Sequence, residues 1–201
     1  MELATIQKGS GACMILSILI ATLESRRTTF ESIYTCLRHQ IVSYGYHGRI
    51  EILSNRDSGQ KTIGQKRNEL LARAQGDYVC HVDDDDRVSD DYVVRLAVAC
   101  GEGRDCVGIV GSIMWHGNWT RFVHSLQYRA YERLPDGTFI RPINHLNPVR
   151  TSIARKFSFT AKNHGEDTDW AMAMLRAAVL GSETFLDDPP VYYYTPAEGP
   201  K

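Results

Sequence analysis

Two groups of acidic residues have the types and spacing to do chemistry. In the first, four consecutive aspartates, Asp83 to Asp86, directly follow the short apolar run Tyr78 to Val82. Adjacent carboxylates repel one another, so a positive group is expected among them. A divalent cation fits, because Mg²⁺ takes oxygen ligands and commonly uses one or two carboxylates together with substrate phosphates. The alternative is a solvated acidic turn before the next helix, whose N-terminal end favours negative charge.

The second group is Glu166, Asp167 and Asp169, which follow Gly165. A carboxylate that holds no metal can accept a proton as a general base. The alternative is ordinary helix charging, because all three acids fall in a first helical turn, where each stabilises a helix by about 0.3–1 kcal/mol. This second pattern, taken alone, leaves both interpretations open.

Alternating strands and helices are predicted to position these acids. Short apolar runs bounded by turn residues predict strands at Met14 to Ala21, Ile50 to Leu53 and Tyr78 to Val82. Helical spacing predicts helices at about Thr28 to Ser43, Ile63 to Gln75 and Asp90 to Cys100, the last behind a Ser89 cap. The order indicates an α/β fold, a single Rossmann-like domain with a mostly parallel central sheet flanked by helices.

In such sheets the ligand crevice lies at the carboxyl ends of the strands. Three segments leave those ends in succession: Thr22 to Arg26, Asn55 to Asp57 and Asp83 to Asp86. We therefore expect these three loops to converge on one site.

The second half of the chain has a less regular pattern. Val107 to Met114 predicts a strand, Phe122 to Tyr131 mixed strand and loop, and Asp136-Gly137 a hairpin turn. A helix is expected to open at Glu166 or Asp167 and to end at Gly181. We interpret residues 14–103 as a nucleotide-binding half and 104–195 as an acceptor-binding half of one domain, residues 14–201.

Composition limits the class of protein. In 201 residues, Lys and Arg total 23 and Asp and Glu total 24, so no basic excess indicates a nucleic-acid partner. The longest apolar run, Met14 to Ala21, is far shorter than the roughly 20 residues that cross a bilayer. Residues 1–13 lack the pattern of a signal peptide and are interpreted as a vector-derived leader.

The five cysteines are odd in number and show no Cys-x-x-Cys spacing. Reduced thiols in a cytoplasmic protein fit this usage better than a disulfide framework or a zinc site. His145, in the run Asn144 to Pro148, is a candidate metal ligand or acceptor contact, although a lone histidine beside a proline-containing turn is more often a structural hydrogen-bonding group.

At this point the sequence resembles the family-2 glycosyltransferases, which have the A-type nucleotide-sugar-binding fold. Ile18 to Thr22 is similar to the family's first strand and its uridine-side loop. Gly64-Gln65-Lys66-Arg67-Asn68 with Ala74 to Tyr78 resembles its "G-x-x-R-N, then A-x-G-[DE]-Y" run. Asp83 to Asp85 matches its DxD signature, and Gly165 to Trp170 its late "G-E-D-x-D" element.

The resemblance implies an inverting, metal-dependent transfer of a sugar from a nucleotide-diphosphate sugar, with UDP the expected carrier, to an acceptor hydroxyl. It implies a nucleoside pocket lined by Thr22, Glu24 and Asp57, with Arg26 and Asp84 nearby. Lys66, Arg67 and Asn68 would contact the base or phosphates.

The resemblance further implies that Asp83 holds ribose or water and that Asp85 binds Mn²⁺ or Mg²⁺, with Asp83 and His145 as further candidate ligands. Asp167 would be the general base, with Glu166 as a further candidate catalytic residue. The first loop reads Thr-Leu-Glu-Ser where many members have Pro-x-Tyr-Asn, so the resemblance does not specify the base. No histidine follows the Glu-Asp pair to act as a late metal ligand.

Two other functions stay open. A sugar-phosphate nucleotidylyltransferase would need a glycine-rich loop after the first strand, and Thr22 to Arg27 contains no glycine. A catalytically inactive nucleotide-sugar binding module would share the donor residues but would release no sugar from the donor. The expected partners are the nucleotide-sugar donor and a hydroxyl acceptor of unspecified identity.

Overall fold

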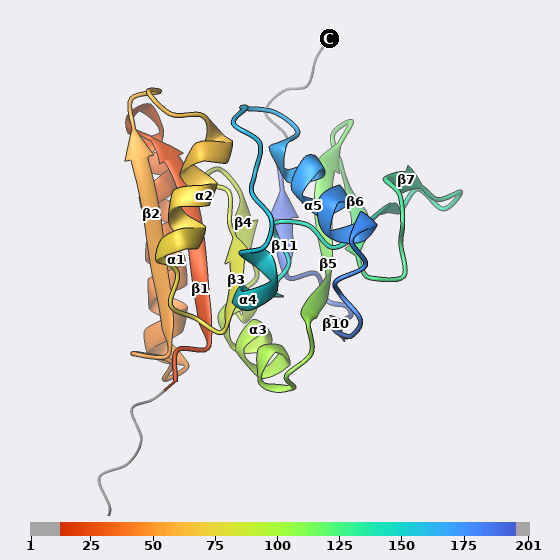
Figure 1. Cartoon of the computed structure of the whole chain (residues 1–201), viewed down its shortest axis with the longest axis horizontal. Helices are drawn as coiled ribbons and strands as arrows, with labels where there is room; N and C mark the ends of the chain where they lie inside the picture. The colour runs from red at the N-terminus through yellow and green to blue at the C-terminus, as the bar shows by residue number, and fades with distance from the viewer. Residues whose placement is uncertain (1–12, 196–201) are drawn as a thin grey trace, which may run out of the picture.

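The computed structural model describes residues 13–195, so the interpreted leader, residues 1–13, lies outside the described residues apart from Cys13. One mixed sheet of 11 strands has helices on both faces (Figure 1). Its strand order is β2-β1-β3-β9-β5-β6-β8-β7, with β10 and β11 also paired to β5 and β4 paired to β11. The expected α/β fold with mostly parallel central strands and flanking helices is confirmed.

The first half alternates strand and helix as predicted. Strands β1 (Leu16–Leu23), β2 (Ile50–Asp57) and β3 (Tyr78–His81) are parallel, with β1 in the middle. Between these strands lie η1 (Glu24–Arg26), α1 (Arg27–Ser43) and α2 (Ile63–Arg73), and the short β4 (Arg87–Val88) and α3 (Tyr92–Gly101) follow β3.

Strand β1 is buried on both sides, which explains its continuous apolar run. Leu16, Ile18 and Ile20 pack in the core beneath α1 and α3. Leu19, on the opposite face, joins the core beneath α2, α4 and α5. Because alternate residues of a strand point to opposite faces, β1 contributes to two cores and lies at the centre of the first half of the sheet.

The second half is built on β5 (Cys106–Trp115). It pairs antiparallel with β6 (Asn118–His124) and parallel with β10 (Glu183–Leu186) and β11 (Tyr192–Tyr194). Strand β9 (Val149–Arg150) runs antiparallel between β3 and β5 and joins the two halves of the sheet. The remaining elements are β7 (Glu132–Arg133), β8 (Phe139–Arg141), α4 (Thr151–Ala154) and α5 (Glu166–Arg176).

Three element predictions were wrong in detail. Helix α5 ends at Arg176 rather than Gly181, because Ala178 adopts a positive φ of 49° and turns the chain, so that Val179 and Leu180 pack against the core. The Ser89 hydroxyl does not cap α3 but donates to the Asp91 carboxylate, at 2.7 Å.

The third difference is β6, which begins at Asn118, before the predicted strand-like stretch. His116 and Gly117 both have positive φ, at 48° and 78°, and connect β5 to β6 by a tight turn. The predicted turn at Asp136-Gly137 is confirmed between β7 and β8. Among residues 13–195, none of the helices combines the length and apolar character needed to cross a bilayer.

Candidate active site

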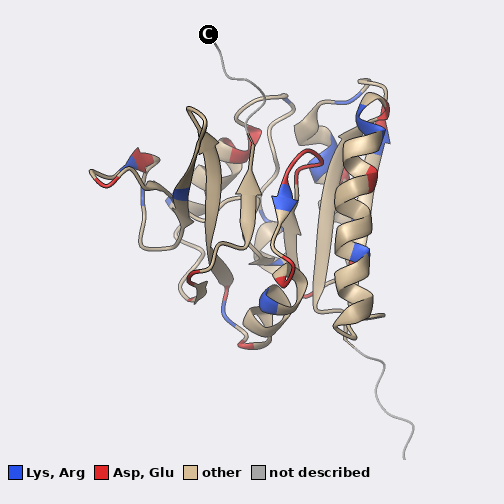
Figure 2. Cartoon of the chain, turned by 180° about the vertical axis from the view of Figure 1, so that it is seen from behind, with Lys and Arg blue, Asp and Glu red and all other residues tan. Residues whose placement is uncertain are grey.

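The first and third of the predicted loops meet at the carboxyl end of β1. The acidic loop Asp83 to Asp86, which precedes β4, is part of the red ribbon beside that strand (Figure 2). The Thr22 hydroxyl, at the end of β1, donates to Asp84 Oδ2 at 2.5 Å. Arg26, in η1, contacts the same loop with both ends of its guanidinium: Nη1 lies 2.6 Å from Asp84 Oδ1 and Nη2 lies 2.9 Å from Asp85 Oδ2.

The second predicted loop contributes Asp57 at the end of β2. Its carboxylate pairs with the buried ammonium of Lys66 and accepts the backbone N–H groups of Gly59 and Lys61, at 3.1 and 2.8 Å. The hydrogen bond from Lys66 holds the pKa of Asp57 below its ordinary value. Lys66 Nζ also donates to the carbonyl of Thr22 at 2.6 Å, so Lys66 ties the ends of β1 and β2 together.

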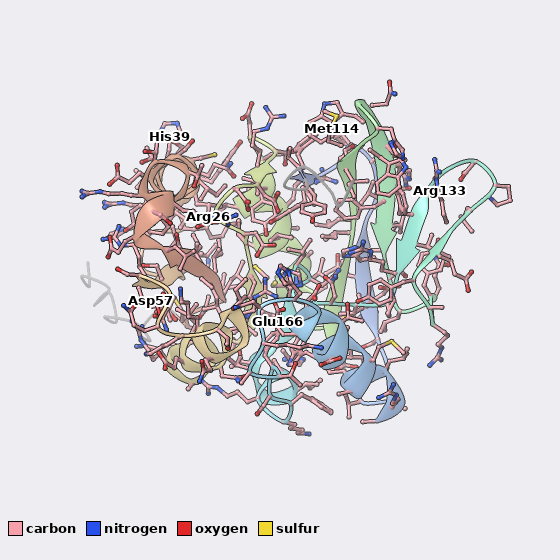
Figure 3. The ribbon with its side chains drawn as sticks, turned by 90° about the horizontal axis from the view of Figure 1, so that it is seen from above. Arg26, His39, Asp57, Met114, Arg133 and Glu166 are labelled. Carbon is pink, nitrogen blue, oxygen red and sulfur yellow. The ribbon has the colours of Figure 1, made fainter. Side chains whose placement is uncertain are left out.

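A cavity of about 300 Å³ lies between these groups. Its walls include the predicted donor residues Thr22, Arg26, Lys66 and Asp84, and on the other side Asn163 and His164 of the loop before α5. In the view from above, Glu166 lies near the middle of the molecule, and Arg26 and Asp57 lie to the left of it, with Asp57 farther out (Figure 3). The cavity therefore has the position expected for a nucleoside at the strand ends.

Arg67, on α2, links the two acidic groups that the sequence singled out. Its guanidinium lies 2.8 Å from Asp83 Oδ1 and 3.0 Å from Glu166 Oε1. The side chains of Arg67 and Glu166 are each only 5% exposed. Although burial raises the pKa of Asp83, attraction to Arg67 and a hydrogen bond with His145 hold it below its usual range. The positive charge of Arg67 thus compensates the negative charge of the buried Glu166.

His145 lies between the two acidic groups. Its Nε2 is 3.5 Å from Asp83 Oδ2 and its Nδ1 is 3.5 Å from Asp167 Oδ2. The backbone of His145 is anchored next to β3, because its carbonyl accepts the N–H of His81 at 2.7 Å. Asp167 keeps 21% of its side chain exposed, in contrast to Glu166. Asp83 and Asp167, 84 positions apart in the sequence, are therefore neighbours across one imidazole.

The fourth aspartate of the loop has a structural role. Asp86 accepts the Tyr192 hydroxyl at 2.8 Å and the Thr195 backbone N–H at 3.1 Å. Burial, followed by repulsion from Asp83, raises the pKa of Asp86 to about 8. The Tyr192 oxygen also accepts the N–H of Asp83 at 3.0 Å. Strand β11 thus fixes the loop, a role for Tyr192 that the sequence analysis did not identify.

The donor set of the acidic loop can be compared with what a divalent cation requires. Asp83 and Asp85 each keep about one third of the side chain exposed, with carboxylate oxygens of the type that Mg²⁺ and Mn²⁺ prefer. Within residues 13–195, no group of three or more His, Cys, Asp or Glu side chains is placed to hold a metal. The residues fit a cation that takes one or two ligands from the protein and the others from substrate phosphates and water.

The other predicted site residues lie at the edge of this arrangement. The side-chain amide of Asn68 exchanges two hydrogen bonds, each 2.8 Å, with the backbone of Phe159, and thereby anchors the loop before α5. Glu24 lies in η1 and pairs with Arg56 at 3.1 Å. The sequence carried no signal for Asn163, whose Oδ1 accepts the N–H of Ile63 at 3.0 Å and closes the cavity.

Comparison with known proteins gives the fold of this site a precedent. No protein-family model matches the chain, and no curated protein matches its sequence. Among solved structures, the chain is similar to residues 1–349 of S. aureus TarS in complex with UDP-GlcNAc, with a TM-score of 0.65, 16% identity and coverage of 93% of this chain and 60% of TarS 1–349.

It is also similar to the same TarS fragment in complex with UDP, with a TM-score of 0.63, 17% identity and coverage of 90% of this chain and 60% of that one. TarS is a family-2 glycosyltransferase. The likeness confirms the A-type nucleotide-sugar transferase fold that the resemblance implied. The chain spans about 60% of the length of the TarS fragment that it matches.

Proposed function

We propose that this chain is an inverting, metal-dependent glycosyltransferase that moves a sugar from a UDP-linked donor to an acceptor hydroxyl. The observation that carries the proposal is the position of His145, 3.5 Å from both Asp83 and Asp167, while Asp84, the residue after Asp83, lines the cavity at the strand ends. Asp83, proposed to bind the donor, and Asp167, which keeps part of its side chain in solvent, thus lie on either side of the same imidazole. The fold shared with TarS, which was solved with UDP-GlcNAc and with UDP, supports this class of donor.

Each group has a defined part in such a transfer. The cavity lined by Thr22, Lys66 and Asn163 would take the nucleoside, and Arg26 with Asp84, which line the same cavity, would lie on its diphosphate side. The oxygen of the acceptor hydroxyl attacks the anomeric carbon from the face opposite the leaving nucleoside diphosphate. Asp167 accepts the proton of that hydroxyl as the new bond forms. Arg67 holds Glu166 and Asp83 in fixed positions on either side.

Asp85, with Asp83 and His145 as further candidate ligands, would hold Mn²⁺ or Mg²⁺ beside the diphosphate. A bound cation stabilises the negative charge that builds on the leaving phosphate. In the protein itself, buried guanidinium and imidazole groups surround Asp83 and keep it ionised. All five cysteines are free thiols, which is compatible with work in a reducing compartment such as the cytoplasm.

The proposal is tested by binding and by turnover. In a thermal-shift panel of nucleotide sugars with and without Mn²⁺, a UDP-sugar should raise the melting temperature, because a ligand of the native state stabilises it. Release of UDP from that donor should follow, with water as a slow acceptor. Stabilisation without UDP release in the presence of added hydroxyl acceptors would indicate a binding module. The absence of stabilisation by any nucleotide sugar would contradict the proposal.

A further inference from the structure

The two acids in the middle of the acidic loop share one internal cation, the guanidinium of Arg26. The contact with Asp84 is anchored, since the Asp84 side chain is 1% exposed and also accepts the Thr22 hydroxyl. The contact with Asp85 lies at the surface, with 43% of the Arg26 side chain and 32% of the Asp85 side chain exposed. One end of Arg26 is fixed and the other faces solvent.

We propose that Arg26 occupies the cation position of the acidic loop in the donor-free protein, so that a divalent cation must displace Arg26 Nη2 from Asp85 in order to bind. This inference rests on the proposed function only in taking Asp85 as a cation ligand. The sequence analysis expected Arg26 near the nucleoside pocket and did not predict that it would compete with the cation.

A cation can displace Arg26 from Asp85 more easily than from Asp84. A half-exposed ion pair contributes little, because water and salt compete for both partners, so Asp85 can release Nη2 at small cost. The pair of Nη1 with Asp84 is shielded from water and remains. The guanidinium therefore stays within a few ångströms of an incoming cation and repels it. Arg26 should lower the affinity of the loop for a free divalent cation both by competition and by repulsion.

The test is the affinity for Mn²⁺ alone, measured by the loss of the free-ion electron paramagnetic resonance signal on titration. Arg26→Gln should lower the dissociation constant by about 5- to 10-fold, since it removes a competing charge next to the site. The matched control is Arg27→Gln, which removes the same charge from the neighbouring residue. Arg27 pairs with Glu31, and its side chain is 69% exposed, so this variant should bind Mn²⁺ as the unmodified protein does.

Two further variants locate the effect. In Arg26→Gln/Asp85→Asn the gain in affinity should disappear, because Asp85 is the ligand that Arg26 blocks. Arg26→Lys should bind Mn²⁺ with an affinity between those of the unmodified protein and Arg26→Gln. The lysine ammonium keeps the charge, but it cannot bridge two carboxylates as the guanidinium does. Arg26→Lys also serves as the test variant if Arg26→Gln does not fold, as judged by circular dichroism.

The inference is overturned if Arg26→Gln binds Mn²⁺ no more tightly than the unmodified protein, if the gain survives Asp85→Asn, or if neither protein binds Mn²⁺. These outcomes are separable from failure of the proposed function. A protein that ignores every nucleotide sugar but shows the Arg26→Gln gain would retain the cation site and lose the transferase proposal. A protein that turns over a UDP-sugar but shows no gain in Mn²⁺ affinity in Arg26→Gln would support the transferase proposal and contradict the inference about Arg26.

Discussion

Two adjacent carboxylates at the start of α5 have different partners, although the sequence presents them as a pair. Glu166 is buried against Arg67, whereas Asp167 faces His145 and keeps part of its side chain in solvent. A base must exchange its proton with a substrate, which favours the accessible, loosely held acid over the ion-paired one. We therefore propose that Asp167 accepts the proton and that Glu166 positions Arg67.

The pairing of Glu166 predicts a loss of stability. Glu166→Gln leaves the Arg67 guanidinium, 5% exposed, with one carboxylate partner in place of two. Breaking a buried ion pair from one side costs about 3 kcal/mol, because the remaining charge is left poorly compensated. Urea unfolding should report a decrease of that size in the free energy of unfolding. A variant as stable as the unmodified protein would show that Glu166 does not hold Arg67.

For single residues, the sequence predicted which side chains belong to the candidate site but not which side chains they contact. It singled out Asp83, Arg67 and Asp167, because acids after a strand and a motif in the helix are local patterns. It did not show that Arg26 spans Asp84 and Asp85, or that His145 lies between Asp83 and Asp167, since these contacts join residues between 22 and 62 positions apart in the sequence. The pairing of charges depends on how the loops pack, which no local pattern encodes.

At the scale of elements, Gly64 explains why α2 can approach the loop before α5. A Cβ on Gly64 would collide with the carbonyl of Thr160, and the N–H of Gly64 donates to the carbonyl of Lys162 at 3.2 Å. The glycine of the "G-x-x-R-N" run is thus required by a close backbone approach. The contact sets the distance between Arg67 on α2 and Glu166 on α5.

We predict that Gly64→Ala destabilises the protein by about 1–3 kcal/mol, because the added methyl must push the Thr160 backbone away. The matched control is Gly101→Ala at the end of α3, where an added Cβ meets no atom within 4 Å. This control should be neutral or stabilising by up to about 1 kcal/mol, as helix propensity favours alanine. Equal effects of the two changes in urea unfolding would contradict the explanation.

The junction of β5 and β10 predicts a dependence of stability on pH. Asp105 Oδ2 accepts the N–H groups of Gly181 and Ser182, at 2.9 and 3.0 Å. The hydrogen bond from Gly181, with those from Ser182, lowers the pKa of Asp105 in the folded state. An unfolded chain then binds more protons, so this contribution is present above pH 4 or so and is lost as pH falls through the folded pKa.

Urea unfolding measured between pH 7 and pH 3 checks this sign. Asp105→Asn should be less stable than the unmodified protein at pH 7 and should lose less stability on acidification. A steeper acid loss in the variant would show that Asp105 does not make this contribution.

The sequence predicted the main elements of the first half because β1 and β3 are buried on both faces, which gives continuous apolar runs, and each helix follows a clear period. It did not predict β9, since two residues carry no period and their place between β3 and β5 is set by the tertiary fold. The end of α5 was missed for a related reason. Ala178 takes a left-handed conformation that its residue type does not signal.

For the whole molecule, the two cores on opposite faces of the sheet predict which thiols can react. Cys80, Cys100 and Cys106 are buried, and burial raises the pKa of the Cys80 thiol to about 12. Cys13 is exposed and Cys36 partly exposed. A thiol reagent at pH 8 should label only Cys13 and Cys36 in the native protein and all five after unfolding in urea, because the thiolate is the reactive form. Fast labelling of Cys80 under native conditions would contradict this packing.

The halves of the molecule meet where the acidic loop, Arg67, His145 and the start of α5 come together. The first half supplies the acidic loop and one wall of the cavity, and the second supplies His145, Asp167, the opposite cavity wall at Asn163 and the β11 strand that fixes the loop through Tyr192. Neither half has both acidic groups. A site that uses both acidic groups therefore requires both halves of the sheet, with β9 as the strand between them.

The most direct measurement is the rate of UDP release from the stabilising UDP-sugar, with Mn²⁺, in Asp167→Asn beside Asp169→Asn. Asp169 lies in the same helical turn but pairs with Lys162 and Thr160, at 2.7 and 2.8 Å. We predict that Asp167→Asn lowers the rate by about 100-fold or more while the donor raises its melting temperature normally, and that Asp169→Asn stays within about twofold. Unchanged turnover in Asp167→Asn would contradict the assignment of the base and the shared site on which it depends.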